Sequence, residues 1–461
     1  MATAQTGTGD RAGRRSRGDF PTPPALIERV LDHCMPEVAA GQVVRVLDPT
    51  CGDGRFLIGA ARRITAAGGV AVLHGLDAHA PVVEHANAMI AAAGWGATSE
   101  IGVGDVRRHV WPDQPYDLVV GNPPFRSPLS AGHAAGAGSG PYTDLATEVL
   151  AVATRLARPD GGRVGLVLPQ SVLAARDAGP VRAEVTAQAA LTWSWWSPRR
   201  LFDADVVVCA VALERRDDRP AGSPRPWNDV VTDTLRIPAT GALATDGVLG
   251  DHARVTANFR DQYYGLVGAV TDADIDGPPL VTSGVIDPAV CHWGARRIRF
   301  AGTAYQAPRV RLDQLSEPMR RWAEALLVPK VLVANQTRVV EAVADPHGRW
   351  LPSVPVLTVR PRSATAVEDV AAVLTSPVAA SWAWHRAAGT GRSATAIRLG
   401  PRWLPELPWP GGPLDDARAA LAAGDIVGCG RAVLAAYGRD DPEQLGWWQR
   451  SLPGRRPHTA D

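Results

Sequence analysis

One βαβ pattern constrains the fold more than any other feature of this chain. Val43 to Leu47 form a short apolar run that predicts a buried strand, and the glycine-containing loop Asp48-Pro49-Thr50-Cys51-Gly52-Asp53-Gly54 follows it. Arg55 to Thr65 then have apolar residues on one face of a helix, and Ala71 to Leu76 predict a second strand. A strand, a crossover helix and a second strand imply parallel pairing, with ligands at the carboxyl ends of the strands.

The alternation of strand and helix patterns continues to about residue 214, which predicts a doubly wound sheet. We expect five segments: a disordered 1–17, a first domain 18–214, a linker 215–227, a mixed second domain 228–410 and a helical tail 411–461. In the tail, helices are expected near Leu414 to Ala423 and Arg431 to Tyr437.

The loop after the first strand is acidic and lacks the G-x-G-x-x-G pattern of dinucleotide-binding loops. Asp48 and Asp53 suit a cationic ligand, such as the sulfonium and ammonium groups of S-adenosylmethionine. Asp77 ends the second predicted strand, where an acidic residue can accept hydrogen bonds from ribose hydroxyls. Asp105 ends a third strand, and its side chain is a candidate to hold an adenine amino group.

A fourth predicted strand ends in Asn122-Pro123-Pro124-Phe125. The amide oxygen of Asn122 and the carbonyl of Pro123 can both accept from a planar amino group. The fixed φ of proline holds that carbonyl in place, and Phe125 offers a ring face for stacking. This combination is typical of methyl transfer to an amino nitrogen.

Together these motifs resemble the gamma class of amino-group DNA methyltransferases, the TaqI-like N6-adenine enzymes. Phe20-Pro21-Thr22-Pro23-Pro24 is similar to the family motif that precedes the first strand, and Leu201-Phe202 with Val206 to Leu213 is similar to its final hairpin. The resemblance implies a mostly parallel seven-stranded sheet, a target-recognition domain after it and S-adenosylmethionine as cofactor. It also implies that Phe20, Thr22 and Pro23 lie at the cofactor, with Thr22 at the methionine carboxylate, and Phe202 against the target base.

The resemblance implies double-stranded DNA as substrate, a restriction-modification or phage-defence setting and action as a monomer. A separately encoded restriction or defence subunit remains open as a partner. Three other targets stay open as well: cytosine N4, RNA and protein glutamine amides, because Asn-Pro-Pro-aromatic also serves these. A non-catalytic DNA-binding specificity subunit is the alternative from another class, and the intact motifs argue against it.

Composition sets further limits. The formal charge is only +1, so DNA binding has to depend on local arginine clusters. Four polar stretches of the second domain are candidates: 258–265, 296–299, 335–338 and 385–393. Lys330 is the single lysine and residue 328 is valine, so a nuclease site of the PD-(D/E)xK kind cannot form around it.

Five scattered cysteines without a C-x-x-C pair, no signal peptide and no long apolar run favour a reducing cytoplasm and no membrane span. The histidines have no metal-ligand spacing, so we expect no metal, and His79 and His85 are expected on a helix surface. Trp193, Trp195 and Trp196 are expected to pack in the core.

Overall fold

The computed structural model describes residues 21–95, 98–125, 144–199, 201, 206–216, 225–258, 260–362, 365–391 and 393–454. The expected disordered segment 1–17 and most of the expected linker lie outside these residues, as do Phe20 and Phe202. By contacts the chain forms two compact units, Met1–Thr234 and Leu235–Asp461, each described here by itself.

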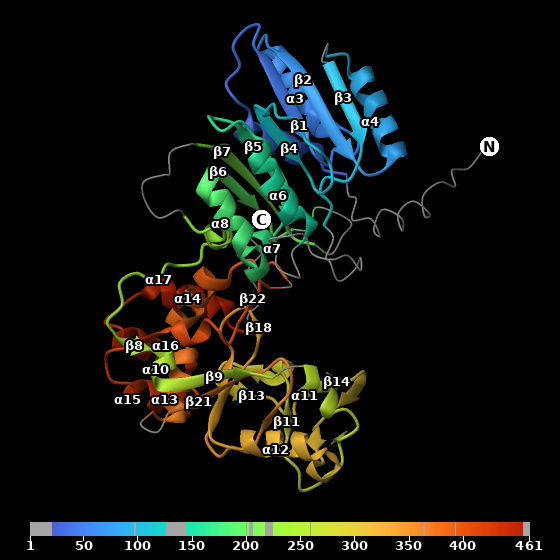
Figure 1. Ribbon diagram of the computed structural model, residues 1–461. Coiled ribbons are helices and arrows are strands. Elements are labelled where there is room, and N and C mark those ends of the chain that lie inside the picture. Colours follow the sequence, from blue (N-terminus) through green and yellow to red (C-terminus); the bar gives the residue numbers. More distant parts are fainter. Residues whose placement is uncertain are drawn as a thin grey trace, which may run out of the picture. The chain divides into compact units, whose positions relative to one another are not determined.

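The first unit alternates strands and helices along the chain (Figure 1). Its strands are β1 (Val43–Asp48), β2 (Val70–Asp77), β3 (Thr98–Val103), β4 (Leu118–Gly121), β5 (Arg163–Pro169), β6 (Ala189–Trp196) and β7 (Val208–Arg215). Its helices are α2 (Pro24–Cys34), α3 (Arg55–Ala66), α4 (Ala80–Ala93), α6 (Leu145–Leu156), α7 (Ser171–Ala174), α8 (Gly179–Gln188) and α9 (Asp229–Thr234).

The seven strands form one sheet in the order β3-β2-β1-β4-β5-β7-β6. The first five strands of this order run parallel, and β7 pairs antiparallel with both β5 and β6. This is the fold of the S-adenosylmethionine-dependent methyltransferases, as expected from the sequence. Because β1, β2, β3 and β4 are parallel, their carboxyl ends and the loops that follow lie at one edge of the sheet.

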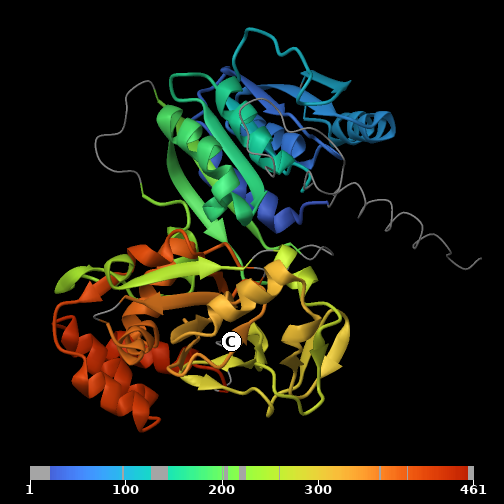
Figure 2. The same cartoon turned by 60° about the horizontal axis from the view of Figure 1, so that its bottom comes forward.

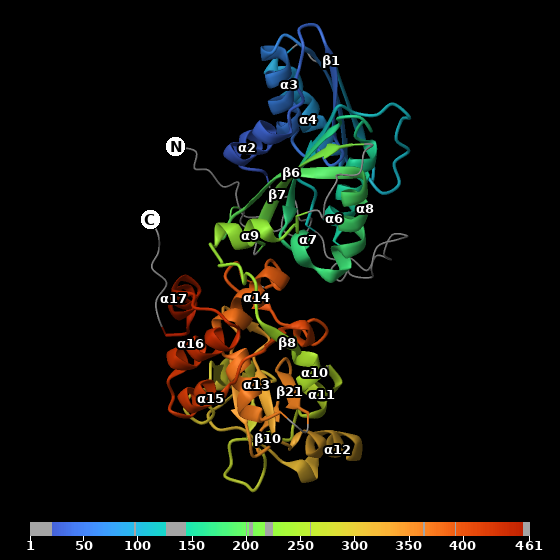
Figure 3. The same cartoon turned by 90° about the vertical axis from the view of Figure 1, so that its left-hand side faces the viewer.

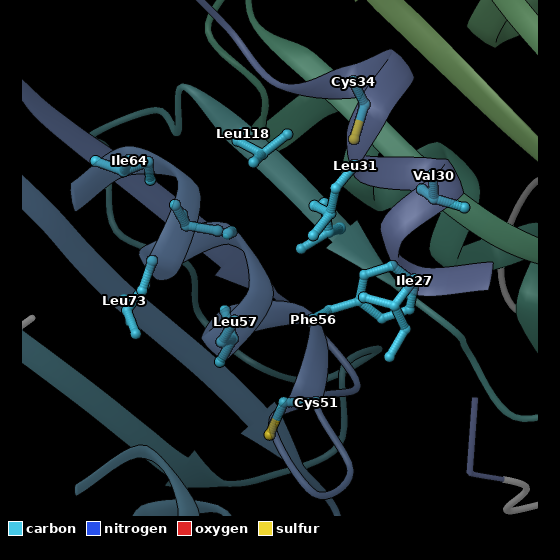
Figure 4. Close-up of a cluster of buried hydrophobic side chains, with 14 of the residues drawn as sticks. Ile27, Val30, Leu31, Cys34, Cys51, Phe56, Leu57, Ile64, Leu73 and Leu118 are labelled. Atoms are coloured by element: carbon cyan, nitrogen blue, oxygen red, sulfur yellow. The ribbon is translucent and has the colours of Figure 1, made fainter. Parts of the chain in front are cut away.

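Helices cover both faces of the sheet. α2, α3 and α4 lie on one face and α6 and α8 on the other, as Figure 3 shows. The core under α2 and α3 joins side chains that are distant in sequence, including Leu31 from α2, Phe56 and Leu57 from α3 and Leu118 from β4 (Figure 4). Burying each such side chain contributes about 1.5–3 kcal/mol, so this core fixes the helix that begins at the Gly54 loop.

The tryptophans of β6 belong to this packing. Trp196 is buried, and its Nε1 donates to Gln170 Oε1 at 3.0 Å. Trp193 and Trp195 are half-buried against the core below α2, where Trp193 stacks on His33 and Arg29 lies over Trp195. All three side chains therefore pack within the first unit, as expected.

The second unit mixes small sheets with helices. A four-stranded sheet has the order β19-β17-β21-β9, and the other strands form pairs (Figure 2). Its strands are β8 (Thr245–Val248), β9 (Ala253–Ala257), β10 (Val270–Thr271), β11 (Leu280–Val281), β12 (Ile286–Asp287), β13 (Val290–Cys291), β14 (Ile298–Phe300), β15 (Thr303–Tyr305), β16 (Arg309–Val310), β17 (Lys330–Val333), β18 (Gln336–Thr337), β19 (Ala342–Asp345), β20 (Leu351–Pro352), β21 (Leu357–Pro361), β22 (Ile397–Arg398) and β23 (Pro408–Pro410). Its helices are α10 (Leu249–His252), α11 (Arg260–Gly265), α12 (Glu317–Leu326), α13 (Val367–Leu374), α14 (Pro377–Ala387), α15 (Asp415–Ala422), α16 (Ile426–Ala436) and α17 (Pro442–Ser451).

The C-terminal helices belong to this second unit. α15, α16 and α17 pack on α13 and α14. The two expected tail helices correspond to α15 and α16, although α16 begins five residues earlier than expected, and α17 was not expected.

The only lysine of the sequence, Lys330, is fully buried in β17, where its Nζ donates to Asp345 Oδ2 at 2.6 Å.

The contact between α2 and β5 predicts which glycines tolerate a side chain. A Cβ atom on Gly165 would lie 2.3 Å from Cys34 Sγ and 2.9 Å from Val30 Cγ1. We expect Gly165→Ala to lower the free energy of unfolding by about 1–3 kcal/mol through overpacking. Gly102→Ala is the matched control, because its Cβ would have Leu76 Cδ1 as nearest atom, at 3.8 Å. Urea unfolding of both variants tests this, and equal stabilities would contradict the packing argument.

Candidate active site

A cavity of about 610 Å³ lies at the carboxyl edge of the sheet in the first unit. A volume of this size is in the range of small-molecule sites. The lining residues come from six places in the sequence: Pro21 and Thr22 before α2, the segments after β1, β2, β3 and β4, and Leu145 at the start of α6. Parallel pairing brings these loops together, because each one leaves a strand at the same edge.

The loop after β1 turns sharply before α3. Gly52 has φ +54° and Gly54 has φ +79°, conformations that residues with a Cβ adopt only with strain. The Cys51 amide donates to Leu76 O at 2.8 Å, and Gly54 N donates to Cys51 O at 2.9 Å. These bonds hold the loop against the end of β2, so its backbone forms one wall of the cavity.

Asp48 is the most deeply buried acid of the site, with 2% of its surface exposed. Its Oδ1 accepts from Thr50 N at 3.0 Å. A Cβ atom on Gly121 would lie 2.7 Å from the same oxygen, so glycine in β4 leaves room for this carboxylate. Burial, together with smaller contributions from the nearby charges of Asp77 and Asp53, raises the pKa of Asp48 to about 8.

Asp77 holds two loops in place. Its Oδ2 accepts from Gly52 N at 3.2 Å, and its Oδ1 accepts from His79 N at 3.0 Å. The carboxylate thus joins the loop after β1 to the beginning of α4. It lines the cavity, so it is also positioned to accept hydrogen bonds from a ligand there.

Asp105 lies at the cavity as expected, but it is paired with a residue that the sequence analysis did not identify. Arg107 donates to it from the backbone N (2.9 Å), from Nε (3.3 Å) and from a terminal nitrogen (3.1 Å). These hydrogen bonds hold the pKa of Asp105 below its usual range. Arg107 also lines the cavity, so this wall is an ion pair and not a lone carboxylate.

Asn122 directly follows β4 and lines the same cavity. Its Nδ2 donates to Thr22 Oγ1 at 3.0 Å, across a separation of 100 residues. This bond orients the amide with Nδ2 towards Thr22 and the acceptor Oδ1 on its other side. Thr22 is itself buried, with 7% of its surface exposed.

Most of the residues predicted for the site meet at this one cavity. The predicted residues in its lining are Thr22, Asp48, Pro49, Thr50, Cys51, Gly52, Asp53, Asp77, Asp105, Asn122 and Pro124. Pro23, Gly54, Pro123 and Phe125 are described but are not among the lining residues, and Phe125 is half-buried against the core under α2 and α3. Phe20 and Phe202 lie outside the described residues.

The cavity also has lining residues that the sequence analysis did not predict. Arg55 forms an ion pair with Asp53 at 2.9 Å. His79 and His85, expected only as exposed residues of the following helix, line the cavity while staying exposed. Their pattern gave no signal, because a histidine at a helix start and another six residues later have no spacing that marks a ligand site.

Among the described residues, no group of three or more His, Cys, Asp and Glu side chains could hold a metal ion. Among the helices that the structure describes, none has the length and apolar character needed to cross a membrane.

Residues 10–222 match the N-6 DNA Methylase family, which is just under half of the chain. Among solved structures, the chain is similar to a protein of Listeria monocytogenes assigned to the class I S-adenosylmethionine-dependent methyltransferases (16% identity, TM-score 0.36, covering 44% of this chain and 61% of that one). It is also similar to the methyltransferase subunit of a type I restriction-modification system from Streptococcus thermophilus (20% identity, TM-score 0.36, covering 43% of this chain and 46% of that one). A third similar structure is an RNA methyltransferase from Salinibacter ruber (18% identity, TM-score 0.26, covering 44% of this chain and 99% of that one).

The matched part spans about half to three fifths of the first two of these proteins. No curated protein sequence matches the chain.

The burial of Asp48 predicts an unusual dependence of stability on pH. Its folded pKa of about 8 exceeds the ordinary value of 3.8, so the protonated form is the one that folding favours. The contribution of Asp48 to the free energy of unfolding is therefore most favourable below pH 4. It falls as the pH rises towards 8, by at most about 1.4 kcal/mol per pH unit. Asp48→Asn removes this loss and keeps an acceptor for Thr50 N. We expect the variant to gain stability over the natural chain between pH 5 and pH 8.

Urea unfolding at both pH values measures this gain. Asp105→Asn is the control, because the lowered pKa of Asp105 places its titration below this range. Its effect on stability should be the same at pH 5 and pH 8. A gain for Asp48→Asn that does not grow with pH would contradict the assigned protonation of Asp48.

Proposed function

We propose that this protein transfers a methyl group from S-adenosylmethionine to the N6 amino group of adenine in DNA, as a site-specific methyltransferase of the gamma, TaqI-like class. One observation carries the proposal. The acids that end β1 and β2, Asp48 and Asp77, line the same cavity as Asn122, whose amide is oriented by Thr22. The match of residues 10–222 to the N-6 DNA Methylase family supports the same chemistry.

The residues of the cavity fit S-adenosylmethionine as cofactor. Asp48, Asp53 and Asp77 place three carboxylates near a ligand that carries a sulfonium and an ammonium group. Asp77 would hold the ribose hydroxyls. The apolar side chains of Pro81 and Val82 in α4 and of Val106 after β3 line the cavity near Asp105, and they suit the faces of an adenine ring. Thr22 would donate its hydroxyl proton to the methionine carboxylate.

The cofactor would supply an electrophilic methyl group, and the protein has to bring out the nucleophilicity of a planar amino nitrogen. The lone pair of such a nitrogen is delocalised into the ring. Asn122 Oδ1 and the Pro123 carbonyl would accept hydrogen bonds from the two N–H groups of this amino nitrogen. These bonds favour a tetrahedral nitrogen with its lone pair exposed. Both carbonyl dipoles also stabilise the positive charge that develops on the nitrogen. This step uses neither a metal ion nor a strong general base.

The target adenine has to leave the duplex stack to reach Asn122, at a cost of a few kcal/mol. We propose that Phe125 and Phe202 offset this cost by stacking on the base. Recognition of the surrounding sequence is assigned to the second unit, since the first unit already contains every motif of the reaction. A restriction-modification or defence role in the cytoplasm, as a monomer on DNA, completes the proposal.

Methylome sequencing of a host with and without the gene tests the function directly. N6-methyladenine at one sequence motif, present only with the gene, is the expected result. Cytosine N4 methylation would change the target base and keep the class of enzyme. Methyl transfer to RNA or to a protein glutamine by the purified chain, or the absence of any transfer, would overturn the proposal.

Cofactor binding should depend on Asp77. Asp77→Ala removes the ribose acceptor and also the bonds from Gly52 N and His79 N that hold the two loops. We expect the dissociation constant for S-adenosylmethionine to rise by about 5- to 150-fold, equivalent to about 1–3 kcal/mol. Calorimetric titration measures this, with Asp113→Ala as control for loss of an exposed acid. Equal affinity in the Asp77 and Asp113 variants would refute the ribose assignment.

Methyl transfer should depend on Asn122 far more than cofactor binding does. Asn122→Ala removes a transition-state acceptor, and we expect the rate to fall by roughly 100-fold or more while cofactor affinity changes little. Thr22→Val keeps the Asn122 amide but removes the bond that orients it, so its rate should fall less. Single-turnover transfer of a labelled methyl group measures both. A normal rate in the Asn122 variant is the result that this mechanism forbids.

A further inference from the structure

The four polar stretches of the second unit come together as two pairs. Stretch 335–338 contributes β18, which pairs with β22 just after stretch 385–393. Stretch 258–265 contains α11, which contacts the β14–β15 hairpin that begins in stretch 296–299. The sequence does not show this pairing, because the members of each pair are about 30 to 60 residues apart. Phe259 and Arg392 lie outside the described residues.

Polar groups of the first pair mainly serve the local fold. Asn335 is buried, and its Nδ2 donates to Leu399 O at 2.8 Å. Thr390 Oγ1 donates to Ala387 O at 2.6 Å and accepts from Arg398 N at 3.0 Å. Arg386 is held in an ion pair with Glu406. Side chains committed in this way are poor candidates for contact with a ligand.

The second pair is built differently. Tyr263 anchors α11 on the hairpin, because its OH accepts from Ala301 N at 3.0 Å and its ring lies 4.9 Å from the ring of buried Phe300. Ala301 and Gly302 have φ +48° and +83°, as in a tight two-residue hairpin turn. Figure 1 shows α11 beside β14. The hairpin and the short helix therefore form one supported structure.

The anchored side chains leave others pointing to solvent. In β14, Ile298 and Phe300 are buried while Arg299 between them is exposed, as strand alternation requires. Arg297, just before β14, is exposed as well. Arg299 Nε donates to Gly302 O of the hairpin turn at 3.2 Å, which leaves its terminal nitrogens for other partners. Next to the anchor, Tyr264 is 65% exposed and meets the Tyr263 ring edge to face at 5.5 Å. We call Tyr264, Arg297 and Arg299 the α11–hairpin surface.

The charges around this surface leave it cationic on the hairpin side. Arg296 and Asp287 neutralise one another in an ion pair at 2.8 Å, and His292 also contacts that carboxylate. Asp261 of α11 is the exposed acid nearest in sequence to Tyr264. Arg299 belongs to β14, and its bond to Gly302 O orients its guanidinium, whereas Arg297 lies at the residue before the strand.

We propose that the α11–hairpin surface binds the sugar-phosphate backbone of duplex DNA. This inference rests on the proposed function and specifies which surface of the second unit contacts the substrate. Guanidinium groups match phosphate oxygens in two-pronged geometry, and a two-stranded ribbon is narrow enough to enter a major groove. The exposed ring of Tyr264 packs on sugars beside the phosphates that Arg297 and Arg299 hold. The surface positions the duplex, and other residues read the bases.

A double variant, Arg297→Ala with Arg299→Ala, tests the charge contacts in the full-length protein. Binding to a labelled duplex of about 30 base pairs is measured by anisotropy between about 50 and 200 mM salt. Loss of two phosphate contacts should lower the slope of log affinity against log salt by about 1.8 and weaken binding by roughly tenfold or more. The matched control is Arg320→Ala with Arg321→Ala in α12, which removes the same charge from exposed residues that pair with Glu317. That control should leave the slope almost unchanged.

Tyr264→Ala and Tyr264→Phe separate the ring from its hydroxyl. The alanine variant should bind DNA roughly tenfold more weakly, and the phenylalanine variant should bind nearly as the natural chain does. All variants should keep their affinity for S-adenosylmethionine and their melting temperature, because the changed side chains are exposed.

The outcomes distinguish this inference from the proposed function. If the natural chain neither binds nor methylates DNA, the proposed function and this inference are both wrong. If it does both and the arginine double variant keeps the full salt slope, only the surface assignment is wrong. Weakened binding of RNA with unchanged binding of DNA would likewise overturn it.

Discussion

The site depends on one constraint: parallel strands end at the same edge of the sheet, and four of these ends bring a carboxylate or an amide to one cavity. Asp48 is the acid whose ionisation this arrangement disfavours most, because burial and the charges of Asp77 and Asp53 raise its pKa to about 8. Above neutral pH, Asp48 becomes a buried anion beside Asp77 and Asp53. A ligand with positive charge stabilises these carboxylates, so the acids of the cavity favour a cationic ligand over an anionic dinucleotide.

Much of the first unit could be predicted from the sequence, because its signals are local. The apolar run before Asp48, the glycines with positive φ after it and the helical pattern from Arg55 each report on their own segment. Parallel pairing then follows from the crossover helix, and the strand-end residues Asp77 and Asn122 are placed at one edge without further information. That is why most of the residues predicted from motifs line a single cavity.

The remaining site features depend on contacts that no local pattern records. Thr22 holds Asn122 across 100 residues. Arg107 is only two residues from Asp105, but its bonds to that carboxylate depend on the turn after β3, which directs its side chain back. The extent of α16 and the presence of α17 were missed for a related reason. Their glycines and tryptophans read as breaks or loops in isolation, and packing on α13 and α14 makes them helical.

The same reasoning separates structural from available polar groups in the second unit. From the sequence, Asn335, Arg386 and Arg297 are equally good candidates for contact with DNA, because all three belong to the polar stretches of the second domain. Burial and partners separate them. Asn335 is buried and donates to Leu399 O, and Arg386 is paired with Glu406. Arg297 is exposed just before β14, whose residues Ile298 and Phe300 are buried. A polar side chain that the fold does not use, on a backbone that the fold holds rigid, is the best candidate for contact with a substrate. This criterion needs the structure, because composition alone cannot tell which polar groups the fold has already engaged.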